Sequence, residues 1–123
     1  MRRRDSWTVR GLIFVTRATR LTSWTLAVCD EGIQCQPTGW WAEWLTLRGA
    51  GPEPVKYPWS EIRRVVLVYR PWSLNPVVTI ERASGRAGRY RIADRYNLDE
   101  NRALLRKYVN VPYVETGFWL LSL

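Results

Sequence analysis

Short runs in which apolar and polar residues alternate recur along this chain and predict β-strands. In residues 23–29, Trp24, Leu26 and Val28 alternate with smaller or more polar side chains, which is the pattern of a strand with one buried face. Comparable or β-branched runs predict five more strands, at residues 7–16, 33–36, 65–69, 77–82 and 89–93.

Two segments between these strands are less regular. Residues 41–47 place apolar side chains at a spacing that fits either a further strand or a helical turn. Residues 49–58 contain two Gly and three Pro, which predicts a loop. The chain therefore has about seven strands if residues 41–47 form one of them.

One segment has a clear helical period. In residues 98–109, Leu98, Leu105 and Tyr108 fall on one stripe, so the helix should lie on the sheet. Asn97 and Glu100 are spaced as in a capping box, in which each side chain bonds an amide of the first turn. We expect a mainly β protein capped by this one C-terminal helix.

The 123 residues suffice for a single core, and no repeat or flexible linker divides them. We place the folded domain at residues 6–111, after a basic arm at 1–5 and before an apolar tail at 112–123. No apolar run approaches the roughly 18–20 residues that span a bilayer, and the first one is too short for a signal peptide. We expect a cytoplasmic protein, or a virion component if the protein is viral.

The composition argues against catalysis. The chain has no His, which removes Ser-His-Asp and Cys-His chemistry and imidazole metal ligands. The candidate carboxylates lie in a turn (Asp30 and Glu31) or beside Arg (Glu61), and no Gly-x-Ser-x-Gly, phosphate-loop or zinc-protease motif is present. We therefore expect a protein that is not an enzyme and holds neither a metal nor a cofactor.

Two cysteines, Cys29 and Cys35, flank a turn at residues 30–32. A loop of two or four residues puts them on opposite faces of a hairpin, whereas a loop of three residues puts them diagonally on one face. We expect two reduced, half-buried thiols.

Residues 57–65 carry a family resemblance. Their sequence, Tyr-Pro-Trp-Ser-Glu-Ile-Arg-Arg-Val, resembles the Pro-Trp-x-x-Ile-x-x-Val element of bacterial pleckstrin-homology-like (PH-like) domains. The hairpin around residues 26–33 and the final helix occur in matching order, so the resemblance covers roughly residues 8–110. It implies a PH-like bent sheet or partly open barrel plugged by the helix, and non-catalytic binding of lipid headgroups, peptides or proteins.

Three tryptophans stand close together at Trp40, Trp41 and Trp44. If the segment is a strand, Trp40 and Trp44 share one face, while Trp41, Leu45 and Leu47 share the other. These rings either fill the mouth of the barrel, anchor a protein partner, or insert into a membrane. Trp is common among the residues that dominate binding energy, which favours a protein interface over the membrane.

The net charge of +8 suggests a polyanion partner, although 17 of the 19 basic residues are Arg, a bias that GC-rich codon usage also produces. Alternation makes Arg89 and Arg91 project outward beside Arg86, either as a solvated face or as a phosphate grip. The loop between the first two strands, which phosphoinositide-binding PH-like domains commonly use, holds two more arginines but no dense basic motif. The candidate polyanion-binding residues, here called the Arg set, are Arg17, Arg20, Arg63, Arg64, Arg86, Arg89 and Arg91.

The apolar tail contains Phe118 and Trp119. It either packs on the domain's own sheet or binds a neighbouring subunit, for example by adding a strand to that subunit's sheet. Our main hypothesis is a PH-like interaction or scaffold module. It docks on protein partners, or on further copies of itself, through Trp40, Trp41, Trp44, Phe118 and Trp119, within a multiprotein or virion-like assembly. The alternative is a module that binds nucleic acid or anionic membrane lipid through the Arg set.

Overall fold

The computed structural model describes residues 7–17, 22–49, 53–69, 75–93 and 97–117. Its strands are β1 (Val9–Arg17), β2 (Ser23–Cys29), β3 (Gly32–Pro37), β4 (Val55–Pro58), β5 (Ile62–Val68), β6 (Val77–Arg82), β7 (Ala87–Ile92) and β8 (Tyr113–Thr116). The helices are α1 (Trp40–Leu47), α2 (Leu98–Tyr108) and a single 3-10 turn, η1 (Trp59–Glu61).

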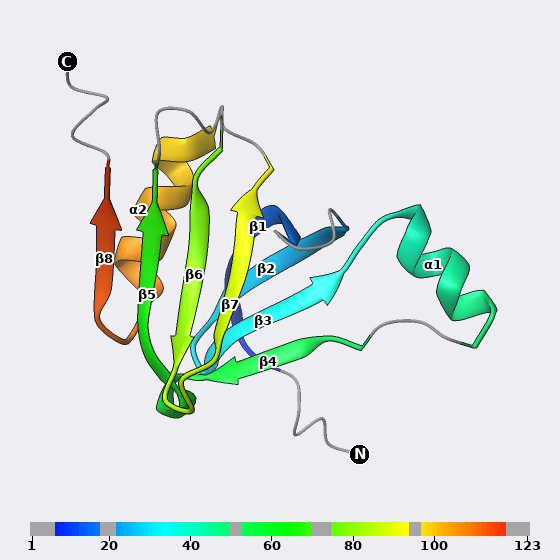
Figure 1. Ribbon diagram of the computed structural model, residues 1–123, viewed down its shortest axis with the longest axis horizontal. Helices are drawn as coiled ribbons and strands as arrows, with labels where there is room; N and C mark the ends of the chain where they lie inside the picture. The colour runs from blue at the N-terminus through cyan, green and yellow to red at the C-terminus, as the bar shows by residue number, and fades with distance from the viewer. Residues whose placement is uncertain (1–6, 18–21, 50–52, 70–74, 94–96, 118–123) are drawn as a thin grey trace.

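The eight strands form one open, bent sheet in the order β4-β3-β2-β1-β7-β6-β5-β8. Neighbouring strands are antiparallel except β5 and β8, which run parallel. Figure 1 shows β8, β5, β6 and β7 side by side, with β3 and β4 running across them at a steep angle. The bend turns one face of the sheet inward, and β4 and β8 are left as its two edges.

Alternation along the strands fills the inward face with apolar side chains. Leu26, Val65, Ile80 and Ile92 are among the fully buried residues, and Leu105 of α2 joins them. Burying side chains of this size stabilises a fold by about 1.5–3 kcal/mol each. The core therefore lies between the bent sheet and α2, as the helical stripe predicts.

Helix α2 packs closely against β1 because β1 has a glycine at the contact. A Cβ atom at Gly11 would overlap the side chain of Leu104, so a larger residue there would push the helix away from the sheet. The helix begins after Asn97, as expected, but Asn97 makes no side-chain capping bond, so the predicted capping box does not form.

A pair of tyrosines joins the two halves of the bent sheet. The hydroxyls of Tyr57 on β4 and Tyr90 on β7 lie 2.9 Å apart, and both side chains are buried. Burial raises the pKa of both hydroxyls. Gly88 leaves room for this contact, because a Cβ there would lie 2.7 Å from the Tyr57 hydroxyl.

The cysteines lie as a two-residue loop requires. Cys35 pairs with Leu26 on the inward face, while Cys29 lies on the opposite face of the hairpin. Both thiols are free, and both are fully buried rather than half-buried as predicted. Burial raises the pKa of Cys35 to about 12, which keeps the thiol protonated at neutral pH.

The structure corrects one expectation and decides two alternatives that the sequence left open. Residues 55–58 form strand β4 inside the predicted loop, because Tyr57 points into the core and the segment pairs with β3. Trp40–Leu47 is a helix, which is one of the two alternatives that the spacing left open. Tyr113–Thr116, part of the predicted tail, forms β8 on the domain's own sheet. The strands therefore number eight in the part of the chain described, against about seven expected. In that same part, no helix is long and apolar enough to cross a membrane.

Candidate functional site

Helix α1 is inserted between β3 and β4 and projects away from the sheet (Figure 1). Pro37 ends β3, and Gly39, with a φ of 96°, turns the chain into the helix at its N-cap position. A left-handed backbone of this kind favours glycine over residues with a Cβ. The helix ends at Arg48, whose backbone N–H donates to the carbonyl of Leu45.

One side of α1 anchors it to the domain. The rings of Trp41 and Trp24 lie 6.0 Å apart, a distance at which aromatic pairs attract. The indole N–H of Trp41 also donates to the carbonyl of Ser23 at 3.2 Å. Ala42, the next residue of the helix, is also buried. Trp41 therefore fixes the helix on the end of β2.

The other side of α1 is apolar and exposed. Trp40 is 78% exposed, Trp44 50% and Leu47 87%. They occupy positions i, i+4 and i+7, which lie on one side of a helix, and we call them the α1 stripe. At these exposures they present roughly 400 Å² of apolar surface to water, as large as the main apolar patch of many monomers.

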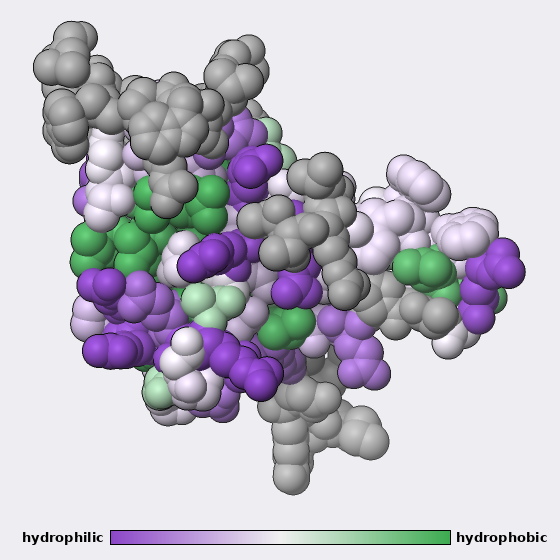
Figure 2. All heavy atoms as spheres, in the orientation of Figure 1, coloured by the Kyte–Doolittle hydropathy of each residue, from purple (hydrophilic) through white to green (hydrophobic). Residues whose placement is uncertain are grey.

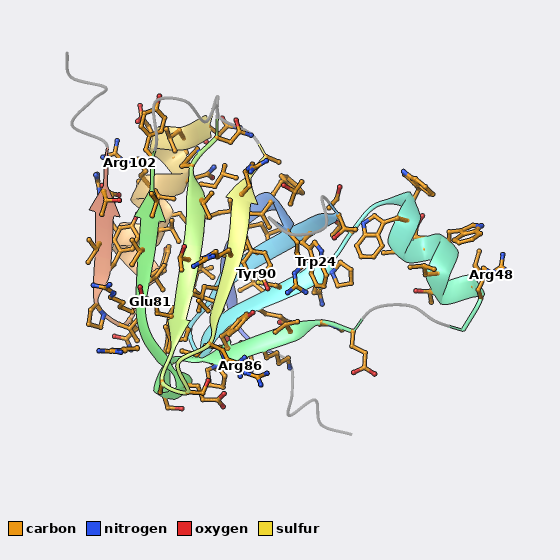
Figure 3. The ribbon with its side chains drawn as sticks, viewed as in Figure 1. Trp24, Arg48, Glu81, Arg86, Tyr90 and Arg102 are labelled. Atoms are coloured by element: carbon orange, nitrogen blue, oxygen red, sulfur yellow. The ribbon has the colours of Figure 1, made fainter. Side chains whose placement is uncertain are left out.

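A cation lies beside this stripe. The guanidinium carbon of Arg48 is 4.8 Å from the centre of the Trp44 ring. Figure 3 shows Arg48 at the far end of α1 and Trp24 on the sheet. Arg48 and Glu43, both exposed, have no ion-pair partner among the described residues.

The structure thus separates the three predicted tryptophans. Trp41 packs on the domain, while Trp40 and Trp44 face solvent. Sequence reasoning missed Leu47, which a strand would have placed with Trp41. The i, i+4, i+7 spacing of Trp40, Trp44 and Leu47 was the available signal, and it has meaning only once the segment is known to be helical.

The other predicted binding residues of the tail, Phe118 and Trp119, lie outside the described residues. The described part of the tail is held by a polar cluster. Glu115 of β8 accepts hydrogen bonds from Arg102 at 2.9 Å, from Arg106 at 2.6 Å and from the hydroxyl of Tyr113 at 2.8 Å. These contacts fasten β8 to α2.

The Arg set does not gather into one patch. Arg64, Arg89 and Arg91 lie on the outer face of the sheet, but Arg64 is paired with Glu81 at 2.7 Å. Arg86 lies in the turn between β6 and β7, and Arg63 is exposed at a bulge in β5.

Arg17, in contrast, faces inward. Its guanidinium lies over the rings of Trp24 and Tyr90, at 5.4 and 5.8 Å from their centres. Arg20 is outside the described residues. The structure therefore places Arg89 and Arg91 together on the outer face of the sheet, Arg86 in the adjoining turn, and Arg17 on the inward face.

The outer face of the sheet also has apolar surface. Val66, Val68, Val77 and Val114 lie together on β5, β6 and β8. Figure 2 shows this apolar area over the upper parts of these strands, above a more polar region. Val66 is only 8% exposed and Val114 37%. These four valines are less exposed than the residues of the α1 stripe.

No protein-family model and no curated protein sequence matches the chain. Among solved structures, it is similar to a chain of the Spt16D Pob3N heterodimer, with a TM-score of 0.57 and 10% sequence identity. The match covers 89% of this chain and 56% of the other, so this chain spans little more than half the length of that neighbour. The match, the open eight-stranded sheet and the C-terminal helix confirm the predicted PH-like fold.

Proposed function

We propose that this protein is a non-catalytic PH-like interaction module that docks on a protein partner through the α1 stripe, as a subunit of a larger assembly. The observation that carries the proposal is the exposure of Trp40, Trp44 and Leu47 on a helix whose opposite side is already anchored. Large aromatic side chains dominate many protein interfaces, and leaving them in water is costly for an isolated domain.

Two further points support this proposal. The similar solved structure is a heterodimer, so the fold occurs in a protein that binds another protein. The helix α1 also stands clear of the sheet (Figure 1), where a partner reaches it without disturbing the core. We include Phe118 and Trp119 in the proposed docking surface, as partner-binding residues of the tail.

The test is to purify the tagged full chain from the cells that express it naturally and to identify and quantify the proteins that stay bound. Replacing both Trp40 and Trp44 with Ala should remove at least nine tenths of the bound partner, because a truncated anchor typically costs 2 kcal/mol or more of binding. Phe14→Ala is the matched control, since Phe14 is 61% exposed but lies on β1. Undiminished binding by the double variant would refute docking through α1.

A second candidate function is polyanion binding by Arg86, Arg89 and Arg91. Its basis is that these three side chains have no carboxylate partner among the described residues, and that the Nε of Arg91 is buried without a hydrogen bond. An unpaired guanidinium can hold a phosphate with two hydrogen bonds.

Salt dependence separates the two functions. Binding of a DNA or RNA oligonucleotide, or of anionic vesicles, through arginines should weaken steeply between about 0.05 and 0.2 M salt. A complex anchored by Trp40 and Trp44 should persist at about 0.5 M salt, where exposed charges are screened. If the chain retains no polyanion at about 0.1 M salt, the second candidate is wrong.

A further inference from the structure

We infer that the partner takes α1 into an apolar groove as a helix with three inserted side chains, and that charges on the two walls of this groove fix the direction of the helix. The inference rests on the proposed function, because it names the kind of surface that binds the α1 stripe. It follows from the arrangement of Trp40, Trp44 and Leu47 and of the two charges beside them.

The α1 stripe is narrow. Successive residues of an α-helix are rotated by about 100°, so positions 40, 44 and 47 fall within an arc of about 60°. Their side chains therefore form a single ridge along a helix of eight residues, about 12 Å long. Helices that bind in grooves use anchors at i, i+4 and i+7 in this way. A ridge of this shape is complementary to a groove rather than to a flat surface.

Opposite charges lie on the two sides of the ridge. The helical rotation places Glu43 on one flank and Arg48, which follows the last turn, on the other. Both are exposed, and neither has an ion-pair partner within the described ranges. A groove with a basic wall facing Glu43 and an acidic wall facing Arg48 complements both. Reversing the helix in that groove would bring like charges together, so the charges select one direction.

Two other occupants fit the stripe less well. A stable protein interface buries about 800 Å² on each partner, about twice what the stripe offers, so the pairing of two α1 ridges is too small, whereas a groove also covers the two flanks of the helix. Helices that lie in anionic membranes carry several Lys or Arg beside their apolar face. The only charged residue within α1 is Glu43, and Arg48 alone follows it. A groove on a protein is therefore the occupant that these observations favour.

Photo-crosslinking in the full chain tests the position of the partner. A photoreactive apolar amino acid is placed at position 40 or 47 on the stripe, or at position 46 away from it, and the protein is irradiated in its native cells. We expect positions 40 and 47 to give adducts with one and the same polypeptide, at least fivefold above position 46. The crosslinked partner residues should line one apolar groove. Equal yields at the three positions, no adduct at all, or adducts with lipid or with a second copy of this chain would each overturn the inference.

Charge reversal tests the direction of the helix. With the crosslinked partner purified, Glu43→Arg and Arg48→Glu should each raise the Kd about tenfold, because each change puts like charges against one wall of the groove. Glu53→Arg is the matched control, because Glu53 is exposed and lies outside α1. No effect of either single change on the Kd would overturn the charged walls and, with them, the fixed direction.

The outcomes also separate this inference from the function on which it rests. If Trp40→Ala with Trp44→Ala abolishes partner binding but the crosslinks spread equally to position 46, docking through α1 stands and the groove is wrong. If the double Trp variant keeps its partner, both fail. Vesicles of phosphatidylcholine and phosphatidylglycerol supply the membrane control. If the wild-type chain floats with these vesicles and the double Trp variant does not, the stripe binds a lipid surface instead.

Discussion

At the scale of single residues, Glu115 has the most consequential environment. Burial alone would raise the pKa of its carboxyl group, but hydrogen bonds from Arg102, Arg106 and Tyr113 outweigh that effect and lower the pKa to about 2. Two of the donors belong to α2, so the carboxylate connects the last strand to the helix that covers the core. A partly buried carboxylate that accepts three hydrogen bonds stabilises the fold only while it is ionised.

This environment predicts a specific pH dependence of stability. The pKa of Glu115 is lower in the folded chain than its ordinary value of 4.5, so its contribution is complete above about pH 4.5 and is lost as the pH falls toward 2. We expect Glu115→Gln to lower the free energy of unfolding by about 2–3 kcal/mol at pH 7. The difference from wild type should shrink to near zero at about pH 2. Urea unfolding of both proteins at several pH values measures it, with the exposed Glu100→Gln as control; an equal loss at pH 7 and pH 2 would contradict the prediction.

At the scale of secondary-structure elements, the sequence best predicts those strands and helices that have a clear local pattern of apolar and polar residues. The strands Ser23–Cys29 and Val77–Arg82 match the prediction residue for residue, and the final helix differs only at its C-terminal end. Each has enough residues for its period to be recognised. The four-residue strands β4 and β8 were missed because they depend on pairing with β3 and β5 more than on any pattern of their own.

The candidate site was also only partly predictable. Trp40 and Trp44 are easy to notice in the sequence. Their separation from Trp41 depends on the rotation of the helix and on the contact between Trp41 and Trp24. A segment of eight residues is too short for its apolar spacing to reveal either. The dispersal of the Arg set is likewise a tertiary effect. Arg17 and Arg91 belong to neighbouring strands, yet they point to opposite faces of the sheet.

The helix α1 supports a prediction that separates its two sides. Trp41→Ala removes the ring contact with Trp24 and the bond to Ser23, so it should lower the free energy of unfolding by about 1–2 kcal/mol, less than truncation of a fully buried Trp. Trp40→Ala, on the exposed side, should change it by less than about 0.5 kcal/mol. Chemical denaturation of the two variants gives both values, and Trp41→Phe should lie between them. Equal losses from Trp40→Ala and Trp41→Ala would mean that the outer side of α1 also packs on the domain.

At the scale of the whole molecule, an open sheet has two edge strands whose outer backbone groups lack a strand partner. In this molecule, each edge strand is held in place by specific contacts. The β4 edge is tied to the other half of the sheet by Tyr57 and Tyr90. On the opposite side, β8 covers the backbone of β5 and is itself fastened to α2 by Glu115. The projecting helix α1 takes part in neither arrangement. The contacts that hold the sheet together are therefore separate from the exposed side of α1, which can be changed without unfolding the molecule.

This division of roles predicts different results from two truncations. A chain ending at Val111 lacks β8, so the β5 backbone loses its partner and Arg102 and Arg106 lose Glu115. We expect that chain to lose several kcal/mol of stability, visible as a much lower Tm or as failure to fold. A chain ending at Gly117 keeps all of these contacts and should unfold within a few degrees of the full chain. If Phe118 and Trp119 bind the partner as proposed, the same chain should bind it at least tenfold more weakly while α1 stays intact. Undiminished binding would confine docking to α1, and a large loss of Tm would instead assign residues 118–123 to the fold.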